Sequence, residues 1–246
     1  MKLLSVLFTL FCLTTVVCKA DLFSDLTAHD RLILQKEIRK YILSNPEVII
    51  EAVKNFEQNA KNDSYQSDAS LIQENYDELF NDGISWEGGN LDGDITIIEF
   101  LDYRCGYCRK AHKEITKLIE SDKNIKFIVK EYPILGAESI LLSRLTVSVL
   151  QLYNKKTYKL IHNKLMEEYI NPSEENIIHL LEKYNLDSAL ILEHLNSDSV
   201  TTHLQETRKN GKALNVNGTP TFIIEDKIIR GYISLKKLRS LISEYR

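Results

Sequence analysis

Residues 95–108 read ITIIEFLDYRCGYC, an apolar run that ends in two closely spaced cysteines. The run from Ile95 to Leu101 is apolar on both faces except for Glu99, as in a central strand of a parallel sheet. From Cys105 onward, apolar residues return every three or four positions, which is typical of a helix. The sequence therefore predicts a strand that leads directly into a helix, with the cysteine pair at the junction.

The segments that follow complete an α/β pattern. Residues 125–129 predict a second strand, so that strand, helix and strand form a βαβ unit. Residues 137–215 have a helical pattern with polar breaks, and residues 221–225 and 227–230 predict a strand pair. Ser234 is placed to cap a final helix.

The region before the first strand is mostly helical by its pattern. Residues 28–61 predict two helices separated at Pro46, which suits the first position of a helix. Residues 57–70 are polar and predict a solvated helix end or a linker. We expect a third short helix over 71–80 and a short strand near 84–86.

The first twenty residues have the pattern of an export signal. Lys2 precedes an apolar run from Leu3 to Val17, which is short for a membrane span of about 20 residues. We expect cleavage after Ala20, so that residues 1–20 are a signal peptide and the protein is periplasmic. An acylated Cys18 and an uncleaved membrane anchor are the alternatives. The segment holds two of the four cysteines, and disulfides persist in exported proteins.

The composition excludes some classes of partner. The chain has 246 residues, with 31 basic and 35 acidic side chains and a net charge of −4. This balance gives no reason to expect a nucleic-acid partner. With nine glycines and four prolines the chain is expected to be compact and rich in helix.

The two remaining cysteines form a Cys-x-x-Cys pair at the predicted helix start. A helix N-terminus stabilises a thiolate, and Arg104, Arg109 and Lys110 add positive charge nearby. We expect Cys105 to be exposed and nucleophilic, whereas Cys108 lies one turn further along, is shielded, and resolves the mixed disulfide. The pair would thus be a redox-active disulfide, and no cofactor is expected.

A Cys-x-x-Cys pair can also attach haem or bind a metal ion. Haem attachment needs a histidine directly after the second cysteine, and Arg109 stands there. A structural zinc site needs four ligands, whereas Cys105, Cys108 and His112 supply three. A metal-binding protein that uses these three residues remains the less favoured alternative, together with a pair of unreactive cysteines.

Two further signals lie outside the pair. Glu99 is the one ionisable residue in its apolar strand, so it is either a partly buried acid with a raised pKa or a solvent-facing residue at a sheet edge. Gly218-Thr219-Pro220-Thr221 precedes a strand. Since only about 5–6% of X-Pro bonds in folded proteins are cis, composition alone predicts a trans bond there.

Taken together, these motifs resemble the thioredoxin superfamily over residues 84–246, and the long helical block resembles the inserted domain of the DsbA family. The resemblance implies that Cys105 is the attacking cysteine, Cys108 the resolving one, and Glu99 the buried acid. It also implies that Pro220 is a cis-proline facing the disulfide and that the backbone of Thr219 pairs with an extended substrate.

The dipeptide between the cysteines departs from DsbA. Gly106 and Tyr107, expected to contact substrate, form the dipeptide of the isomerases DsbC and DsbG, and a threonine before the cis-proline is also isomerase-like. Oxidation of exported proteins is the expected role, with an oligomeric disulfide isomerase or reductase as the alternative. A non-catalytic surface protein that keeps the fold is a third.

The resemblance also implies a division of the chain and a set of partners. We expect an N-terminal helical segment and linker over 21–80, a thioredoxin-fold domain over 84–136 and 216–246, and an inserted helical domain over 137–215. Expected partners are unfolded or reduced exported proteins and a membrane redox partner. Residues 28–61 resemble the leading segment of ScsC-like proteins and would support a homo-oligomer; alternatively they pack on their own catalytic domain.

Overall fold

The computed structural model describes residues 26–246, and all of their side chains except those of 57–66. The predicted signal peptide, including Cys18, lies outside these residues. The chain divides into two compact units, residues 1–59 and 60–246. Over residues 26–246, none of the helices combines the length and the apolar character needed to cross a membrane.

The first unit is helical where it is described. Its helix α1 (Ala28–Ser44) begins with a capping box, in which Thr27 and Asp30 each accept a hydrogen bond from the other's backbone N–H. No residue of α1 is buried. Large apolar side chains of α1 and of the start of α2 (Glu47–Glu74) are instead exposed: Leu32, Ile33, Leu34, Ile38, Tyr41, Leu43, Val48, Ile49, Ile50, Val53 and Phe56.

Helix α2 is longer than the sequence indicates. The polar stretch 57–70 is helical throughout, and α2 ends only at Glu74, so this stretch is part of the helix rather than a linker. The Asn75 amide donates to the carbonyl of Leu71 at 2.8 Å and ends α2 there. The helix predicted over 71–80 is therefore the last part of α2 followed by the short α3 (Tyr76–Phe80).

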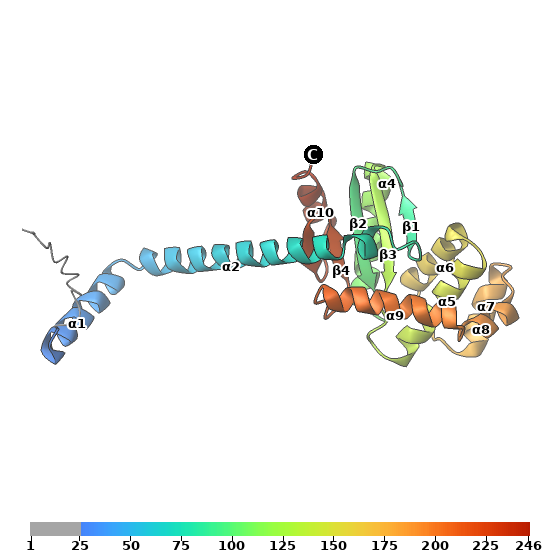
Figure 1. The fold of residues 1–246 in the computed structure, drawn as a ribbon, viewed down its shortest axis with the longest axis horizontal. Helices are drawn as coiled ribbons and strands as arrows, with labels where there is room; N and C mark the ends of the chain where they lie inside the picture. The colour runs from blue at the N-terminus through green and yellow to red at the C-terminus, as the bar shows by residue number, and fades with distance from the viewer. Residues whose placement is uncertain (1–25) are drawn as a thin grey trace, which may run out of the picture. The chain divides into compact units, whose positions relative to one another are not determined.

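The second unit is built on a mixed sheet of five strands in the order β1-β3-β2-β4-β5. Figure 1 shows β3 between β2 and β1. Strands β2 (Ile95–Leu101) and β3 (Ile125–Glu131) are parallel and are joined through α4 (Gly106–Asp122), which confirms the predicted βαβ unit. The other three strands pair antiparallel; they are β1 (Trp86–Gly89), β4 (Thr221–Ile224) and β5 (Lys227–Arg230).

The first strand begins later than predicted. Backbone N–H groups of Ile84 and Ser85 donate to the carboxylate of Asp82 at 3.0 and 2.9 Å. These hydrogen bonds form a turn, so pairing with β3 starts only at Trp86.

Both faces of the sheet are covered, which explains why β2 is apolar throughout. Ile97 and Leu101 belong to the larger core, which also includes residues of α4 and of α10 (Leu235–Ile242). Ile98 and Phe100 belong to a second core together with Phe80 of α3. Because side chains alternate along a strand, Glu99 points to the same face as Ile97 and Leu101.

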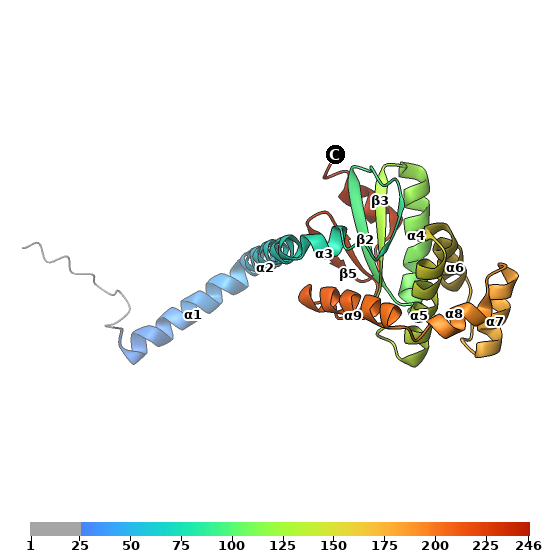
Figure 2. The ribbon, with the colours of Figure 1, turned by 45° about the vertical axis from the view of Figure 1, so that its right-hand side comes forward.

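Five helices stand between β3 and β4, in the region expected to be an inserted helical domain. They are α5 (Ala137–Leu152), α6 (Lys155–Glu167), α7 (Glu174–Lys183), α8 (Ser188–His194) and α9 (Asp198–Ala213). Figures 1 and 2 show α5 to α8 gathered beside the sheet. Leu142 of α5 and Tyr158 of α6 join the same core as β2, so the helices and the sheet share one interior. The predicted fold class, a thioredoxin fold with a helical insertion and an N-terminal helical extension, is confirmed.

Candidate functional site

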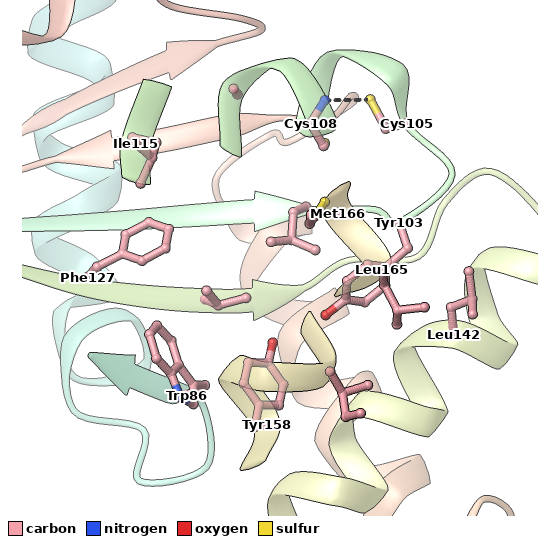
Figure 3. Packing of buried hydrophobic residues seen from close by; sticks show 14 of the residues in the cluster. Trp86, Tyr103, Cys105, Cys108, Ile115, Phe127, Leu142, Tyr158, Leu165 and Met166 are labelled. Atoms are coloured by element: carbon pink, nitrogen blue, oxygen red, sulfur yellow. Dashed lines mark hydrogen bonds between the residues drawn. The ribbon is translucent and has the colours of Figure 1, made fainter. Parts of the chain in front are cut away.

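The cysteine pair lies at the start of α4, where β2 ends. Cys105 is the N-cap residue of this helix, with an extended backbone at φ −79° and ψ 113°. Its sulfur accepts a hydrogen bond from the backbone N–H of Cys108 at 3.4 Å, drawn as a dashed line in Figure 3. A sulfur at this position meets the unpaired N–H groups and the positive end of the helix dipole.

The two cysteines differ in exposure less than the sequence analysis expects. Cys105 retains 7% of its surface, so the prediction that it is exposed is wrong; Cys108 retains none. Cys105 is covered because the loop before β4 packs over it, with the Cys105 thiol donating to the carbonyl of Thr219 at 3.1 Å. The asymmetry between the two sulfurs remains in the predicted direction.

The same asymmetry governs their ionisation. The pKa of Cys105 is lowered to about 5, chiefly by a hydrogen bond from the Cys108 thiol, with smaller contributions from Thr219 and the backbone N–H of Cys108; partial burial opposes the shift. Burial raises the pKa of Cys108, and its contacts with Cys105 and the charge of Glu99 add to the rise. The thiolate therefore forms at Cys105, and Cys108 holds a proton that hydrogen-bonds to it.

The positively charged side chains of Arg104 and Arg109, near the pair, contact groups other than the Cys105 sulfur. The Arg104 guanidinium stacks on the ring of Tyr169 at 4.1 Å and pairs with Glu138 at 2.8 Å. Arg109 donates to the carbonyl of Tyr103 at 3.0 Å. Hydrogen bonds, rather than these charges, are the main causes of the lowered pKa of Cys105.

Glu99 is a buried acid, and the alternative of a solvent-facing strand residue is wrong. It is 2% exposed, and its Oε1 has no hydrogen-bond partner among the residues that the structure describes. Burial raises the pKa of Glu99 well above its usual range, and the charge of Cys105 raises it further. Burial thus favours the protonated form of Glu99, which lies on the sheet face that α4 covers, and its ionisation is coupled electrostatically to that of both cysteines.

The loop before β4 has the conformation that the family resemblance implies. The Thr219–Pro220 bond is cis, contrary to the expectation from composition alone. The Thr221 hydroxyl donates to the carbonyl of Gly218 at 2.8 Å, and Gly231 N–H donates to the carbonyl of Pro220 at 2.8 Å. These bonds present the Thr219 carbonyl to the Cys105 sulfur.

The dipeptide between the cysteines is on the surface. Gly106 and Tyr107 are both exposed, and the Tyr107 ring retains 65% of its surface. No heavy atom lies within 4 Å of where a Cβ would stand on Gly106. Side chains at these two positions are therefore free to meet another molecule, which keeps their substrate-binding role a prediction.

Asp102 is a residue of the site that the sequence analysis misses. It is fully buried, and its carboxylate accepts backbone hydrogen bonds from Arg104 at 2.8 Å, from Ile134 at 2.8 Å and from Leu135 at 3.0 Å. Its carbonyl accepts from Cys105 N–H at 3.1 Å. Asp102 thus joins the segment before Cys105 to the loop after β3. An acid directly between a buried strand and the cysteine pair was the available signal.

His112 lies on α4, one turn beyond Cys108. It lines a cavity of about 100 Å³ together with His162, Lys159 and the ring of Trp86, and its ring is 5.2 Å from that of His162. Burial lowers the pKa of His112 to about 4. Across residues 26–246 no group of three or more His, Cys, Asp and Glu side chains is arranged to hold a metal ion. The metal-binding alternative therefore loses the site on which it depends.

A thioredoxin-type sheet, a thiolate at a helix N-terminus and a cis-proline loop against its sulfur define the thioredoxin class of dithiol proteins. Comparison with known families narrows this class: residues 96–243 match the DSBA-like thioredoxin domain. The chain therefore belongs to the DsbA family of thiol:disulfide oxidoreductases. Residues 34–62 match the N-terminal domain of the copper resistance protein ScsC.

Solved structures and curated proteins agree with this assignment. A thioredoxin-like oxidoreductase from Silicibacter pomeroyi DSS-3 is 30% identical, with a TM-score of 0.64, and the match covers 69% of this chain and 96% of that one. The thiol-disulfide exchange protein alpha-DsbA2 from Wolbachia pipientis is 27% identical, with a TM-score of 0.69 and coverage of 74% and 98%. Disulfide bond formation protein D from Bacillus subtilis (strain 168) is 22% identical over 166 residues, covering 63% of this chain and 74% of the relative.

A further match covers only a small part of the related protein. Na(+)/H(+) antiporter NhaA 1 from Salinispora arenicola (strain CNS-205) is 19% identical over 156 residues, or 63% of this chain. The chain spans 24% of the length of that antiporter. What the antiporter does as a whole is therefore not assigned to this chain.

Proposed function

We propose that this protein is exported to the periplasm and forms disulfide bonds in other exported proteins by exchange at Cys105-Gly106-Tyr107-Cys108. One observation carries the proposal: the pKa of Cys105 is lowered to about 5, whereas burial raises that of Cys108. A stabilised Cys105 thiolate favours the reduced form of the pair, and a pair that is stable when reduced is a good oxidant.

The reaction begins with the oxidised pair. A substrate thiolate attacks the Cys105 sulfur, a mixed disulfide forms, and the Cys108 sulfur leaves as a thiolate. A second substrate thiolate then attacks the substrate sulfur of the mixed disulfide, which releases a substrate disulfide and the Cys105 thiolate. Two electrons pass to the pair, and the disulfide of a membrane redox partner takes them up again.

Four residues are proposed to assist the exchange. Glu99 exchanges the proton of Cys108, since it is the buried acid coupled to that sulfur. The carbonyl of Thr219 accepts a hydrogen bond from the Cys105 thiol in this structure. During exchange it would instead accept one from the backbone of an extended substrate. Pro220, whose carbonyl accepts from Gly231 N–H at 2.8 Å, holds this loop beside Cys105, and the exposed Tyr107 contacts the substrate side chains.

Disulfide isomerisation is the second candidate, and the first unit favours it. Isomerases act from the reduced state, in which Cys105 attacks a substrate disulfide. The exposed apolar side chains of α1 and α2 and the match of residues 34–62 to an ScsC N-terminal domain support a homo-oligomer through 28–61. An assembled set of catalytic units around unfolded substrates suits isomerisation.

The first test is the redox equilibrium of the Cys105–Cys108 pair. The mature protein is equilibrated with glutathione buffers, and the disulfide is quantified by thiol alkylation. A midpoint more oxidising than about −180 mV supports an oxidase or isomerase, and one near the roughly −270 mV of thioredoxin overturns the assignment.

Roles of the two sulfurs are tested by trapping. Cys108→Ala is expected to accumulate a mixed disulfide at Cys105 with an unfolded substrate that carries a disulfide, because the Cys105 thiolate attacks that disulfide, one substrate sulfur leaves as a thiolate, and no resolving thiol remains. Cys105→Ala serves as the matched control and should trap nothing. Recovery of adducts at Cys108 would reverse the assignment of the two cysteines.

A further inference from the structure

Glu131 is a buried carboxylate at the end of β3 that the proposed reaction does not use. It is 1% exposed. Four hydroxyls surround it: those of Tyr103, Thr146 and Tyr158 donate to Oε1 at 2.7, 2.8 and 2.5 Å, and that of Ser143 donates to Oε2 at 2.7 Å. A carboxylate only accepts hydrogen bonds, so four donors satisfy it well.

The four donors come from different parts of the fold. Tyr103 lies between β2 and Cys105, Ser143 and Thr146 lie on α5, and Tyr158 lies on α6. Figure 3 shows Tyr103 and Tyr158 reaching the same region of the core from separate elements. Glu131 thereby joins the helical insertion to the segment that carries the nucleophile.

The hydroxyl of Tyr103 has two partners. It lies 2.7 Å from Glu131 Oε1 and 2.9 Å from His162 Nδ1. The Tyr103 hydroxyl has a single hydrogen to donate. When it donates this hydrogen bond to Glu131, the tyrosine oxygen accepts one from the Nδ1–H of His162. Burial raises the pKa of Glu131, and its four hydroxyl donors oppose that rise.

The backbone of Tyr103 is tied to the cysteine loop as well. Its carbonyl accepts from Arg109 of α4 at 3.0 Å, and it follows Asp102, whose carbonyl accepts from Cys105 N–H at 3.1 Å. A shift of Tyr103 would therefore move Cys105 relative to the Cys108 N–H, which lies only 3.4 Å from its sulfur. Hydrogen bonds weaken steeply when such geometry is disturbed.

We infer that Glu131 is a positioning residue for thiol–disulfide exchange: through the Tyr103 hydroxyl it holds the segment before Cys105 against the helical insertion and keeps the Cys105 sulfur at the start of α4. This inference rests on the proposed function, in which Cys105 is the nucleophile. Glu131 touches neither the sulfur nor the substrate, so its effect reaches the reaction only through Tyr103.

The test compares two tyrosines that donate to the same oxygen. In the full-length reduced protein, the rate of iodoacetamide alkylation of Cys105 is measured from pH 3.5 to 9. Tyr103→Phe removes one hydroxyl and is expected to raise the pH midpoint of Cys105 alkylation above about 5. Alkylation at pH 5 should then be about fivefold slower, because less Cys105 thiolate is present. Tyr158→Phe removes an equally buried hydroxyl from α6 and should keep the wild-type midpoint.

Equal shifts in both variants, or no shift in Tyr103→Phe, would overturn the inference and leave the network a purely structural one. Thermal unfolding of each variant verifies that it is folded. If either phenylalanine variant does not fold, Glu131→Val and Glu131→Gln are compared instead. Glutamine keeps a hydrogen-bond acceptor for the Tyr103 hydroxyl, and valine does not. A raised midpoint with valine alone supports the role, and an unchanged midpoint with valine contradicts it.

The wild-type profile separates this inference from the proposed function. A wild-type Cys105 that is unreactive at pH 5 to 7 would contradict the proposed function itself. A reactive wild type with an unchanged Tyr103→Phe variant contradicts only the role of Glu131.

Discussion

Two cysteines three residues apart have opposite acid–base behaviour in this protein. Cys105 is at the helix start, where the Cys108 N–H and thiol both point at its sulfur. Cys108 is one turn deeper and fully buried, next to an acid that is itself buried. The chemistry depends on this local difference in solvation and hydrogen bonding, since the two side chains are otherwise identical.

The lowered pKa of Cys105 predicts a specific pH dependence of stability. Its pKa falls from 9.0 to about 5 on folding, so the stabilisation is fully present above pH 9.0 and is lost as the pH falls through about 5. We expect the melting temperature of the reduced protein, relative to the oxidised one, to rise between pH 5 and 9. Calorimetry of both redox forms measures this. Cys105→Ser, which cannot form the thiolate, should abolish the trend.

Glu99 should affect both stability and rate. The pKa of Glu99 is higher in the folded protein than its unfolded value of about 4.5. The contribution of Glu99 to the free energy of unfolding is therefore fully present below about pH 4.5 and is lost as the pH rises through the folded pKa. Glu99→Gln should therefore gain melting temperature over wild type only as the pH rises above 4.5. It should also slow the attack of substrate thiolates on the oxidised pair roughly tenfold or more, because the departing Cys108 sulfur loses its proton donor. The exposed Glu120→Gln on α4 is the control, and equal effects in both would argue against the role of Glu99.

At the scale of elements, the site is made where several segments end together. Four segments meet at Cys105: the end of β2, the start of α4, the loop after β3 and the loop before β4. The Asp102 carboxylate accepts hydrogen bonds from three backbone N–H groups of these segments.

On the other face of the sheet, Arg230 of β5 donates two hydrogen bonds to Asp68 of α2, at 2.8 and 2.9 Å. That contact holds the last part of α2 against the catalytic unit.

The Asp68–Arg230 pair should contribute measurably to stability. The Asp68 side chain is only 7% exposed, so Arg230→Gln leaves a buried carboxylate without its partner. We expect a loss of about 1–3 kcal/mol in the free energy of unfolding, measured by urea titration. The Lys209–Glu206 pair, 3.8 Å apart and largely exposed, provides the control. Lys209→Gln should change stability by less than about 0.5 kcal/mol. A similar loss in both variants would show that the buried pair has no special effect.

At the scale of the whole molecule, the two units differ in how they treat their apolar residues. The second unit buries a core on both faces of its sheet. In the first, α1 buries none of its residues, although Ile38 and Tyr41 follow one another at helical spacing, as do Val53 and Phe56 on α2. Apolar surface of this extent is typical of a contact between proteins.

An oligomer formed through the first unit predicts that its apolar stripe controls the mass in solution. Ile38→Glu with Val53→Glu should reduce the mass measured by light scattering to that of a monomer, because charges cannot be buried in such a contact. Alkylation of Cys105 should be unchanged, since the catalytic unit is untouched. Lys36→Glu, on the same helix, should keep the wild-type mass. A monomeric wild-type protein would contradict the proposed homo-oligomer.

Much of this protein follows from local pattern. The apolar run of β2, the change to helical period at Cys105 and the polar breaks that become N-caps at Asn154 and Ser173 depend on interactions within a few residues. Such interactions are readable in the sequence because the periods of strand and helix differ. The α/β pattern and the placement of the cysteines at a helix start are therefore determined by the sequence alone, and the thioredoxin fold is what the resemblance carried by these motifs implies.

Only the tertiary structure decides the rest. The burial of Glu99, the cover over Cys105, the length of α2 and the four hydroxyls around Glu131 all depend on segments that are distant in the chain. Neither solvation nor hydrogen bonding across such distances leaves a periodic trace in the sequence. The pKa of a group depends on both, so the sequence indicates which residues are candidates to react, and the packing decides how readily they ionise.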